Sequence, residues 1–131
     1  VFVSSLARYV LYPGSSVYAA TKCAVAALSR CLRAGGWRTL TVYPGPTRTQ
    51  QARDNAVDNS REARRMAPAT VARAVRRAYG HGKARLCPGA KNKLFQYIGY
   101  LAPRITGAAM KKAIFDKLPA RDDLAMGHGA V

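Results

Sequence analysis

Two side chains near the start of the chain have the types and the spacing for proton transfer. Tyr18 and Lys22 lie four residues apart in Tyr-Ala-Ala-Thr-Lys, and side chains at that spacing project from one face of a helix. A phenol is a weak base at neutral pH, but a neighbouring ammonium group favours the phenolate. The pair could therefore take a proton from an alcohol or give one to a carbonyl oxygen. Alone, a Tyr and a Lys at this spacing are more often an exposed helix pair than a site.

Two further segments are expected to meet this pair in space. Ser5 lies 13 residues before Tyr18, at the end of a short apolar run typical of a buried strand. The segment Pro44–Thr49, which reads Pro-Gly-Pro-Thr-Arg-Thr, follows a second apolar run. Ligands of open parallel sheets bind outside the carboxyl ends of the strands. Ser5, the Pro44 loop and the first turn of the Tyr18 helix are all expected at that edge, and this convergence predicts a site.

The ordered set of Ser5, Tyr18, Lys22 and the Pro44 loop resembles the second half of a short-chain dehydrogenase/reductase. The resemblance covers roughly the first fifty residues strongly and most of the others loosely. It implies an NAD(P)-dependent oxidoreductase that interconverts an alcohol and a carbonyl by hydride transfer, with NAD or NADP as cofactor. By resemblance, Ser5 orients the reacting oxygen and Tyr18 is the general acid/base. Lys22 then favours the phenolate and binds the nicotinamide ribose.

The resemblance also implies a set of cofactor contacts and a substrate class. The implied cofactor-binding residues are Tyr18, Lys22, Pro44, Gly45, Thr47 and Thr49. The Pro-Gly loop would lie along the nicotinamide, because proline fixes its backbone and glycine allows a close approach. Backbone near Thr47 would meet the carboxamide, and the Thr49 hydroxyl would sit close to the carboxamide or the phosphates. A small-molecule alcohol or carbonyl is the expected substrate, and no metal is expected.

Other features of the family's pattern are missing. The sequence holds no Gly-x-x-x-Gly-x-Gly turn, no Asn-Asn-Ala-Gly segment and no counterpart of the catalytic asparagine. We therefore expect a fragment: residues 1–118 form a partial Rossmann-type domain without its glycine-rich cofactor half. A full-length parent is expected to be a homo-oligomer. The interval from Lys22 to Pro44 is, however, about one helical turn shorter than usual, in a helix that commonly forms the family's subunit interface.

The periodicity of apolar residues and the Gly and Pro punctuation predict the elements that position these residues. Strands are expected over 1–5, 38–43 and 84–87, and helices over 17–34, over 68–79 and in two stretches of 91–117 around Pro103. Strands that alternate with helices predict an α/β fold, here the C-terminal half of a doubly wound parallel sheet. Residues 119–131 are expected to form a disordered tail.

Charge is the strongest anomaly of the composition. The chain of 131 residues carries a formal charge of +16, and residues 1–53 contain no acid. Such a charge attracts phosphates, nucleic acid or anionic lipid. The basic residues are, however, scattered along the sequence without interleaved base-stacking aromatics, so we expect no specific nucleic-acid partner.

Two rival functions stay open beside the oxidoreductase. The first is a truncated, non-catalytic fragment, and the second is a basic amphipathic protein that binds membrane surfaces through residues 91–117. No apolar run is long enough to cross a bilayer. The three cysteines have no metal-ligand spacing and suit a reducing cytosol, so a cytoplasmic location is expected. The substrate and the choice between NAD and NADP are left open.

Overall fold

A sheet of three short parallel strands lies at the centre of the chain. The structure is a computed structural model that describes residues 1–10, 15–50, 53 and 62–114. The strands are β1 (Phe2–Val3), β2 (Thr41–Val42) and β3 (Arg85–Leu86), and they neighbour one another in that order. Phe2 pairs with Thr41, and Val42 with Leu86. Each strand lies within a predicted one, and the prediction of an α/β chain with a parallel sheet is confirmed.

Among the described residues, four α-helices are delimited at both ends, and three of them begin within one residue of the predicted start. They are α1 (Ser16–Ala34), α3 (Pro68–Gly80), α4 (Ala90–Leu101) and α5 (Pro103–Ile114), with the 3-10 turns η1 (Leu6–Arg8) and η2 (Glu62–Arg64). Pro68 opens α3 at a position where a missing N–H leaves no hydrogen bond unmade. Helix α1 ends at a glycine cap, Gly35. The predicted tail and the boundary at residue 118 lie outside the described residues.

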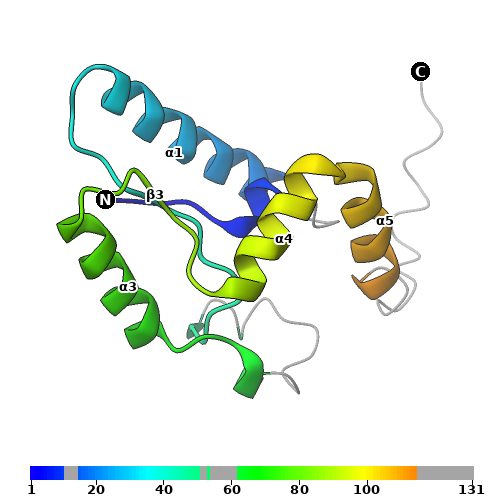
Figure 1. Cartoon of the computed structure of the whole chain (residues 1–131). Helices are drawn as coiled ribbons and strands as arrows, with labels where there is room; N and C mark the ends of the chain where they lie inside the picture. Colours follow the sequence, from blue (N-terminus) through cyan, green and yellow to red (C-terminus); the bar gives the residue numbers. More distant parts are fainter. Residues whose placement is uncertain (11–14, 51–52, 54–61, 115–131) are drawn as a thin grey trace, which may run out of the picture.

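The helices α1 and α3 cover opposite faces of the sheet (Figure 1). Residues of an extended strand alternate between the two faces. Leu40 and Val42 are buried in a cluster with Ala78 of α3. Thr41, between them, turns the other way, and its Oγ1 donates a buried hydrogen bond of 2.7 Å to Ser29 Oγ of α1. Helices therefore pack against both faces of the sheet.

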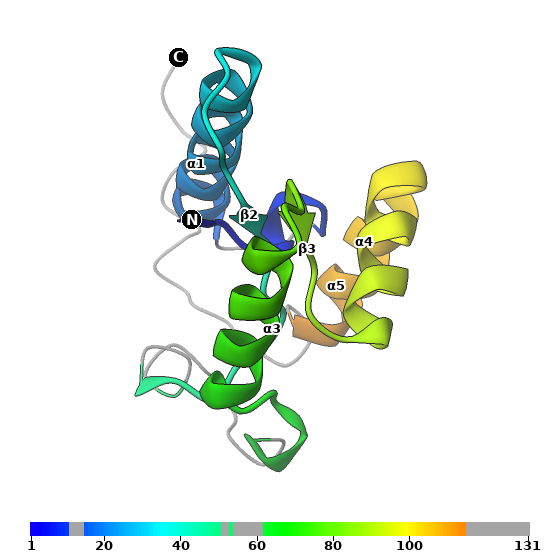
Figure 2. The same ribbon diagram turned by 60° about the vertical axis from the view of Figure 1, so that its left-hand side comes forward.

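The helices α4 and α5 follow β3 and lie beside each other in both ribbon views (Figure 2). The chain breaks at Ala102, whose backbone is not helical, because Pro103 disfavours a helical residue before it. Gly99 of α4 lies directly against the backbone carbonyl of Tyr9, and a Cβ at this position would collide with that carbonyl. This close approach sets which face of α4 is turned toward the rest of the chain.

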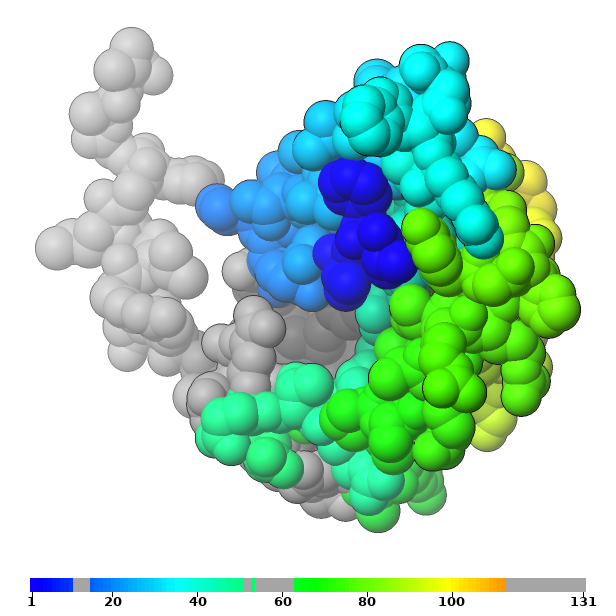
Figure 3. All heavy atoms as spheres, turned by 90° about the vertical axis from the view of Figure 1, so that its left-hand side faces the viewer, coloured from blue at the N-terminus to red at the C-terminus, as the bar shows by residue number. Residues whose placement is uncertain are grey.

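Strand β1 is an edge of the sheet within the described residues. The amides of Phe2 and Ser4 donate to Leu40 and Val42 of the neighbouring segment, so the amide of Val3 points to the open side. The Val1 and Val3 side chains are more than half exposed. Figure 3 shows these first residues at the surface between α1 and α3. Within the described residues, an apolar strand edge is thus open.

Candidate functional site

Tyr18 and Lys22 occupy the first two turns of α1 and are in contact. The Lys22 Nζ lies 5.5 Å from the centroid of the Tyr18 ring, which is within cation–π range. The same Nζ donates a hydrogen bond of 3.3 Å to the backbone carbonyl of Val3. Tyr18 is 41% exposed, whereas Lys22 is half-buried. The lysine is therefore held between the open edge of β1 and an aromatic ring that solvent and small molecules can reach.

A serine neighbouring the predicted one fastens this helix to the sheet. The Oγ of Ser4 donates a hydrogen bond of 2.8 Å to the backbone carbonyl of Lys22, and Ser4 is only 2% exposed. Sequence reasoning chose Ser5 from the adjacent pair and assigned no role to Ser4. The local signal was the serine doublet at a strand end, which does not say which hydroxyl turns toward the helix.

Ser5 caps the 3-10 turn that follows β1. Its Oγ accepts a hydrogen bond of 3.1 Å from the Ala7 amide, and its backbone is extended, as an N-cap residue requires. No hydrogen bond joins Ser5 to Tyr18 among the described residues. As an acceptor in this cap, the Ser5 hydroxyl keeps its own proton for a further partner. The predicted orienting role thus remains chemically open, with the hydroxyl position already set by the cap.

The Pro44 loop lies next to Ser5 at the carboxyl ends of β1 and β2. The Leu6 amide donates to the Pro44 carbonyl at 3.0 Å, and the Ser4 amide to the Val42 carbonyl at 2.9 Å. The two chain segments therefore continue side by side beyond the strands. The structure brings Ser5, Lys22 and Pro44 to this one edge of the sheet, the edge at which the sequence placed them.

Gly45 makes its close approach to the protein's own side chain. A Cβ at Gly45 would lie 2.5 Å from both terminal atoms of Asn92, a residue of α4. The Asn92 Nδ2 donates a hydrogen bond of 2.8 Å to the Pro88 carbonyl, which fixes the amide there. The resemblance had reserved the freedom of this glycine for a nicotinamide ring. One side of the Pro-Gly loop is instead covered by Asn92, which sequence reasoning missed because it lies 47 positions further along the chain.

The later residues of the loop are tied to the segment that precedes α3. The Thr47 Oγ1 donates to the Gly45 carbonyl at 2.9 Å, which closes the turn. Thr47 also forms a β-bridge with Met66, and the Arg48 amide donates to the Met66 carbonyl at 3.0 Å. Thr49 is exposed, and its carbonyl accepts from the Arg53 amide. Thr47 and Thr49 thus lie on a braced loop, with the hydroxyl of Thr47 turned inward.

A buried tyrosine lies under the turn that Ser5 caps. Tyr43 is 1% exposed, its ring meets the Tyr9 ring edge-on at 5.2 Å, and its hydroxyl accepts from Arg8 Nη1 at 3.4 Å. Burial raises the pKa of Tyr43, a side-chain hydrogen bond to Tyr9 adds to the rise, and the Arg8 charge opposes it. Burial likewise raises the pKa of the Cys87 thiol. Neither group is suited to lose a proton at neutral pH.

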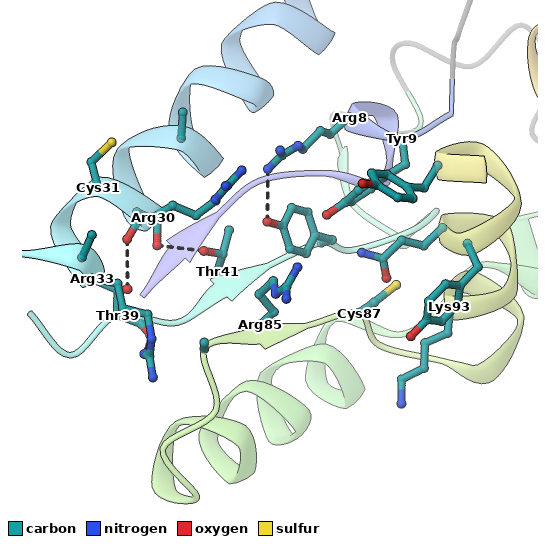
Figure 4. A pocket seen from close by; sticks show the side chains of 18 residues that line it. Arg8, Tyr9, Arg30, Cys31, Arg33, Thr39, Thr41, Arg85, Cys87 and Lys93 are labelled. Atoms are coloured by element: carbon teal, nitrogen blue, oxygen red, sulfur yellow. Dashed lines mark hydrogen bonds between the residues drawn. The ribbon is translucent and has the colours of Figure 1, made fainter. Parts of the chain in front are cut away.

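A broad groove of about 1340 Å³ opens on the α1 face of the sheet, between the second half of α1 and α4 (Figure 4). Thr41, Tyr43 and Cys87 line its floor. Its basic side chains come from every surrounding element: Arg8, Arg30, Arg33, Arg85 and Lys93. No acidic residue lines it. Ser5, Tyr18 and Lys22 are not among its lining residues, so the groove and the proton-transfer pair are separate features.

Comparisons with known proteins identify no relative. No family model, no curated protein and no solved structure matches this chain. Among the described residues, no three His, Cys, Asp or Glu side chains are grouped so as to hold a metal ion. No described helix combines the length and the apolar character needed to cross a bilayer.

Proposed function

We propose that this chain provides the catalytic half of an NAD(P)-dependent oxidoreductase that interconverts an alcohol and a carbonyl. The observation that carries the proposal is the position of the Lys22 ammonium, over the Tyr18 ring and bonded to the Val3 carbonyl. The ammonium is thereby fixed beside a phenol that a substrate can reach, and a phenol within reach of the substrate can transfer its proton. The adjacent carboxyl ends of β1 and β2 are where open parallel sheets bind ligands.

In this mechanism the chain's own groups handle the proton, and the dinucleotide supplies or accepts the hydride. For alcohol oxidation, the Tyr18 Oη takes the hydroxyl proton while the carbon loses hydride. For carbonyl reduction, the same Oη returns the proton to the oxygen. The Ser5 hydroxyl donates to the reacting oxygen, since its role in the cap uses only its lone pair. Lys22 holds its ammonium group beside the phenol ring and is the candidate donor to the nicotinamide ribose.

The residues present fit the nicotinamide end of a cofactor on one side of the loop only. In this proposal Lys22 would meet the ribose, and the exposed Thr49 would meet a phosphate. The side of Gly45 that Asn92 covers is closed to a ring. A nicotinamide must therefore approach the loop from the Tyr18 side, or Asn92 must move. The rival assignment, a non-catalytic chain, predicts no binding preference at these residues.

Binding of a cofactor fragment tests the proposal on the chain itself. Reduced nicotinamide mononucleotide is titrated into the 15N-labelled protein, with adenosine monophosphate, which also carries a single phosphate, as the matched control. We expect shifts at Tyr18, Lys22 and Thr49 with the nicotinamide compound alone, at a dissociation constant of about 1 mM or weaker. Lys22→Ala should abolish these shifts, whereas Lys83→Ala, at an exposed lysine before β3, should not. Equal shifts with both nucleotides would show only phosphate attraction to a cationic chain and would sink the proposal.

A further inference from the structure

Helix α4 packs its polar and small residues against the rest of the chain and exposes its apolar ones. The residues that it directs toward the rest of the chain are Asn92, Gln96 and Gly99, all half-buried or buried. Its large apolar side chains face away, with Leu94 60% exposed, Phe95 52% and Leu101 76%. A helix on the surface of a globular protein ordinarily buries its apolar stripe and exposes its polar one. The reversal marks the exposed stripe as an interaction surface.

The orientation of α4 is set by contacts that leave no room for the helix to roll. Gly99 lies against the Tyr9 carbonyl, where a larger residue would collide. At the other end, Asn92 bonds to the Pro88 carbonyl and lies against Gly45. Both contacts are specific to the small and polar side of the helix. The apolar stripe therefore faces outward because of the packing of the inner side.

Four residues make up this stripe, which we call the outer face of α4. They are Leu94, Phe95, Ile98 and Leu101. At about 100° per residue they fall within roughly one third of the helix circumference, and Lys91 lies on the same side. Tyr97 borders the stripe beside Leu101 and is 65% exposed. Tyrosine at the edge of an apolar surface is typical of the boundary between lipid and water.

The charge around the outer face has one sign. From Ala63 to Ile114 the sequence contains no Asp or Glu. Among the described residues, the exposed cations of α4 and α5 outside the groove are Lys91, Arg104, Lys111 and Lys112. An apolar stripe whose charged neighbours are lysine and arginine complements a surface with an apolar interior and anionic headgroups. A second copy of this chain would instead bring like charges together on a molecule of formal charge +16.

We propose that α4 and the start of α5 dock the protein on an anionic lipid surface. The outer face enters the boundary between headgroups and acyl chains, Tyr97 lies at headgroup level, and Lys91 and Arg104 meet the lipid phosphates. The helix lies along the bilayer surface, because only one of its sides is apolar. This proposal uses no residue of the Tyr18 site, so it stands or falls independently of the oxidoreductase.

Co-sedimentation with vesicles tests the docking surface. The chain is mixed with vesicles of phosphatidylcholine alone or with phosphatidylglycerol added. We expect binding to the anionic vesicles, and a loss of roughly tenfold or more for Leu94→Ser/Leu101→Ser, because two large apolar side chains no longer enter the lipid. Trp37→Ser is the matched control, since Trp37 is 69% exposed but lies before β2, far from α4 in the sequence. Circular dichroism confirms that both variants are folded.

A charge pair and a depth probe complete the test. Lys91→Gln/Arg104→Gln should weaken binding more than Arg73→Gln/Arg76→Gln, which removes two exposed cations from α3. In a Trp37→Phe background, Phe95→Trp should show blue-shifted fluorescence that lipids brominated in the acyl chain quench. The proposal is wrong if the chain ignores anionic vesicles. It is equally wrong if the Leu94/Leu101 variant binds the vesicles as the parent does, because the binding would then be only the attraction of a cationic chain. It is also wrong if the substitutions abolish self-association and leave vesicle binding unchanged.

Discussion

At the residue scale, the spacing of Tyr18 and Lys22 in a helix is enough to bring the two side chains together. Four residues of helix bring the ammonium over the ring, and this contact needs no other part of the fold. A second contact, the hydrogen bond from Lys22 to the Val3 carbonyl, depends on the sheet. It joins the end of β1 to the helix that crosses over it, so Lys22 is both a proposed catalytic group and a fastening of α1.

The distinct contacts of these side chains predict distinct kinetic effects. These effects are expected in any longer polypeptide in which residues 1–131 follow a glycine-rich dinucleotide-binding half. There, Tyr18→Phe should lower turnover by about 10² to 10⁴ with cofactor affinity little changed, because only the proton donor is lost. Lys22→Ala should lower turnover and weaken cofactor binding together. Steady-state kinetics measure both effects, and turnover within about threefold of the parent for Tyr18→Phe would exclude its role.

Gly45 and Gly99 are both required for close packing, but against neighbours of different kinds. A methyl at Gly45 meets the Asn92 side chain, whereas a methyl at Gly99 meets the Tyr9 backbone. Each substitution to alanine should lower the free energy of unfolding by about 1–3 kcal/mol, as overpacking does. Asn92→Ala should restore most of the loss in Gly45→Ala and none in Gly99→Ala. Urea unfolding of the three single variants and the two double variants measures these losses. Equal rescue of Gly45→Ala and Gly99→Ala by Asn92→Ala would contradict these contacts.

Tyr43 predicts a loss of stability in alkaline solution. Burial raises its pKa above the ordinary phenol value of about 10, so the folded state favours the neutral form. The resulting stabilisation is complete below about pH 10 and is lost as the pH rises through the raised folded pKa. The free energy of unfolding should therefore fall across this range, and less steeply in Tyr43→Phe. Parallel denaturation series from pH 8 to 12 measure the difference, and identical slopes would count against it.

At the scale of elements, a buried contact between two hydroxyl groups links α1 to β2. The hydrogen bond between Thr41 and Ser29 is buried on both sides, and Ser29 is fully inaccessible. Ser29→Ala or Thr41→Val alone leaves a buried hydroxyl unpaired and should cost about 1–3 kcal/mol. The double variant removes both hydroxyls and should be close to the parent. Thermal unfolding of the four proteins gives the coupling, and strictly additive losses would exclude it.

The open edge of β1 bears on the behaviour of the whole molecule. The Val3 amide points away from β2, and an unpaired apolar edge is a template for association. At 0.15 M salt, where charge repulsion is screened beyond about 8 Å, we expect the chain to self-associate. Val3→Pro removes this outward amide without breaking a bond to β2, so it should lower the association. Sedimentation velocity measures it, and an unchanged mass distribution would assign the association elsewhere.

The sequence by itself determined the features that depend on neighbours along the chain. Helix periodicity gave the start of α1 within one residue, Pro68 marked the start of α3, and the apolar runs located all three strands. The contact between Tyr18 and Lys22 followed from the same period. These are local properties, because a turn of helix or an alternating strand involves only a few consecutive residues. The N-terminus of α1 is a local exception: Ser15 stands at the cap without the side-chain hydrogen bond that serine commonly supplies there.

Only the tertiary structure decided which distant residues share a surface. It turned Ser4 toward α1 and set Ser5 on a cap, although the two are adjacent in sequence. It placed Asn92 against Gly45, and it gathered scattered arginines around one groove. It also turned the apolar side of α4 outward, against the expectation for an amphipathic helix. Each outcome depends on which side chains fit between elements far apart in the sequence, and this complementarity exists only once the sheet and the helices have packed.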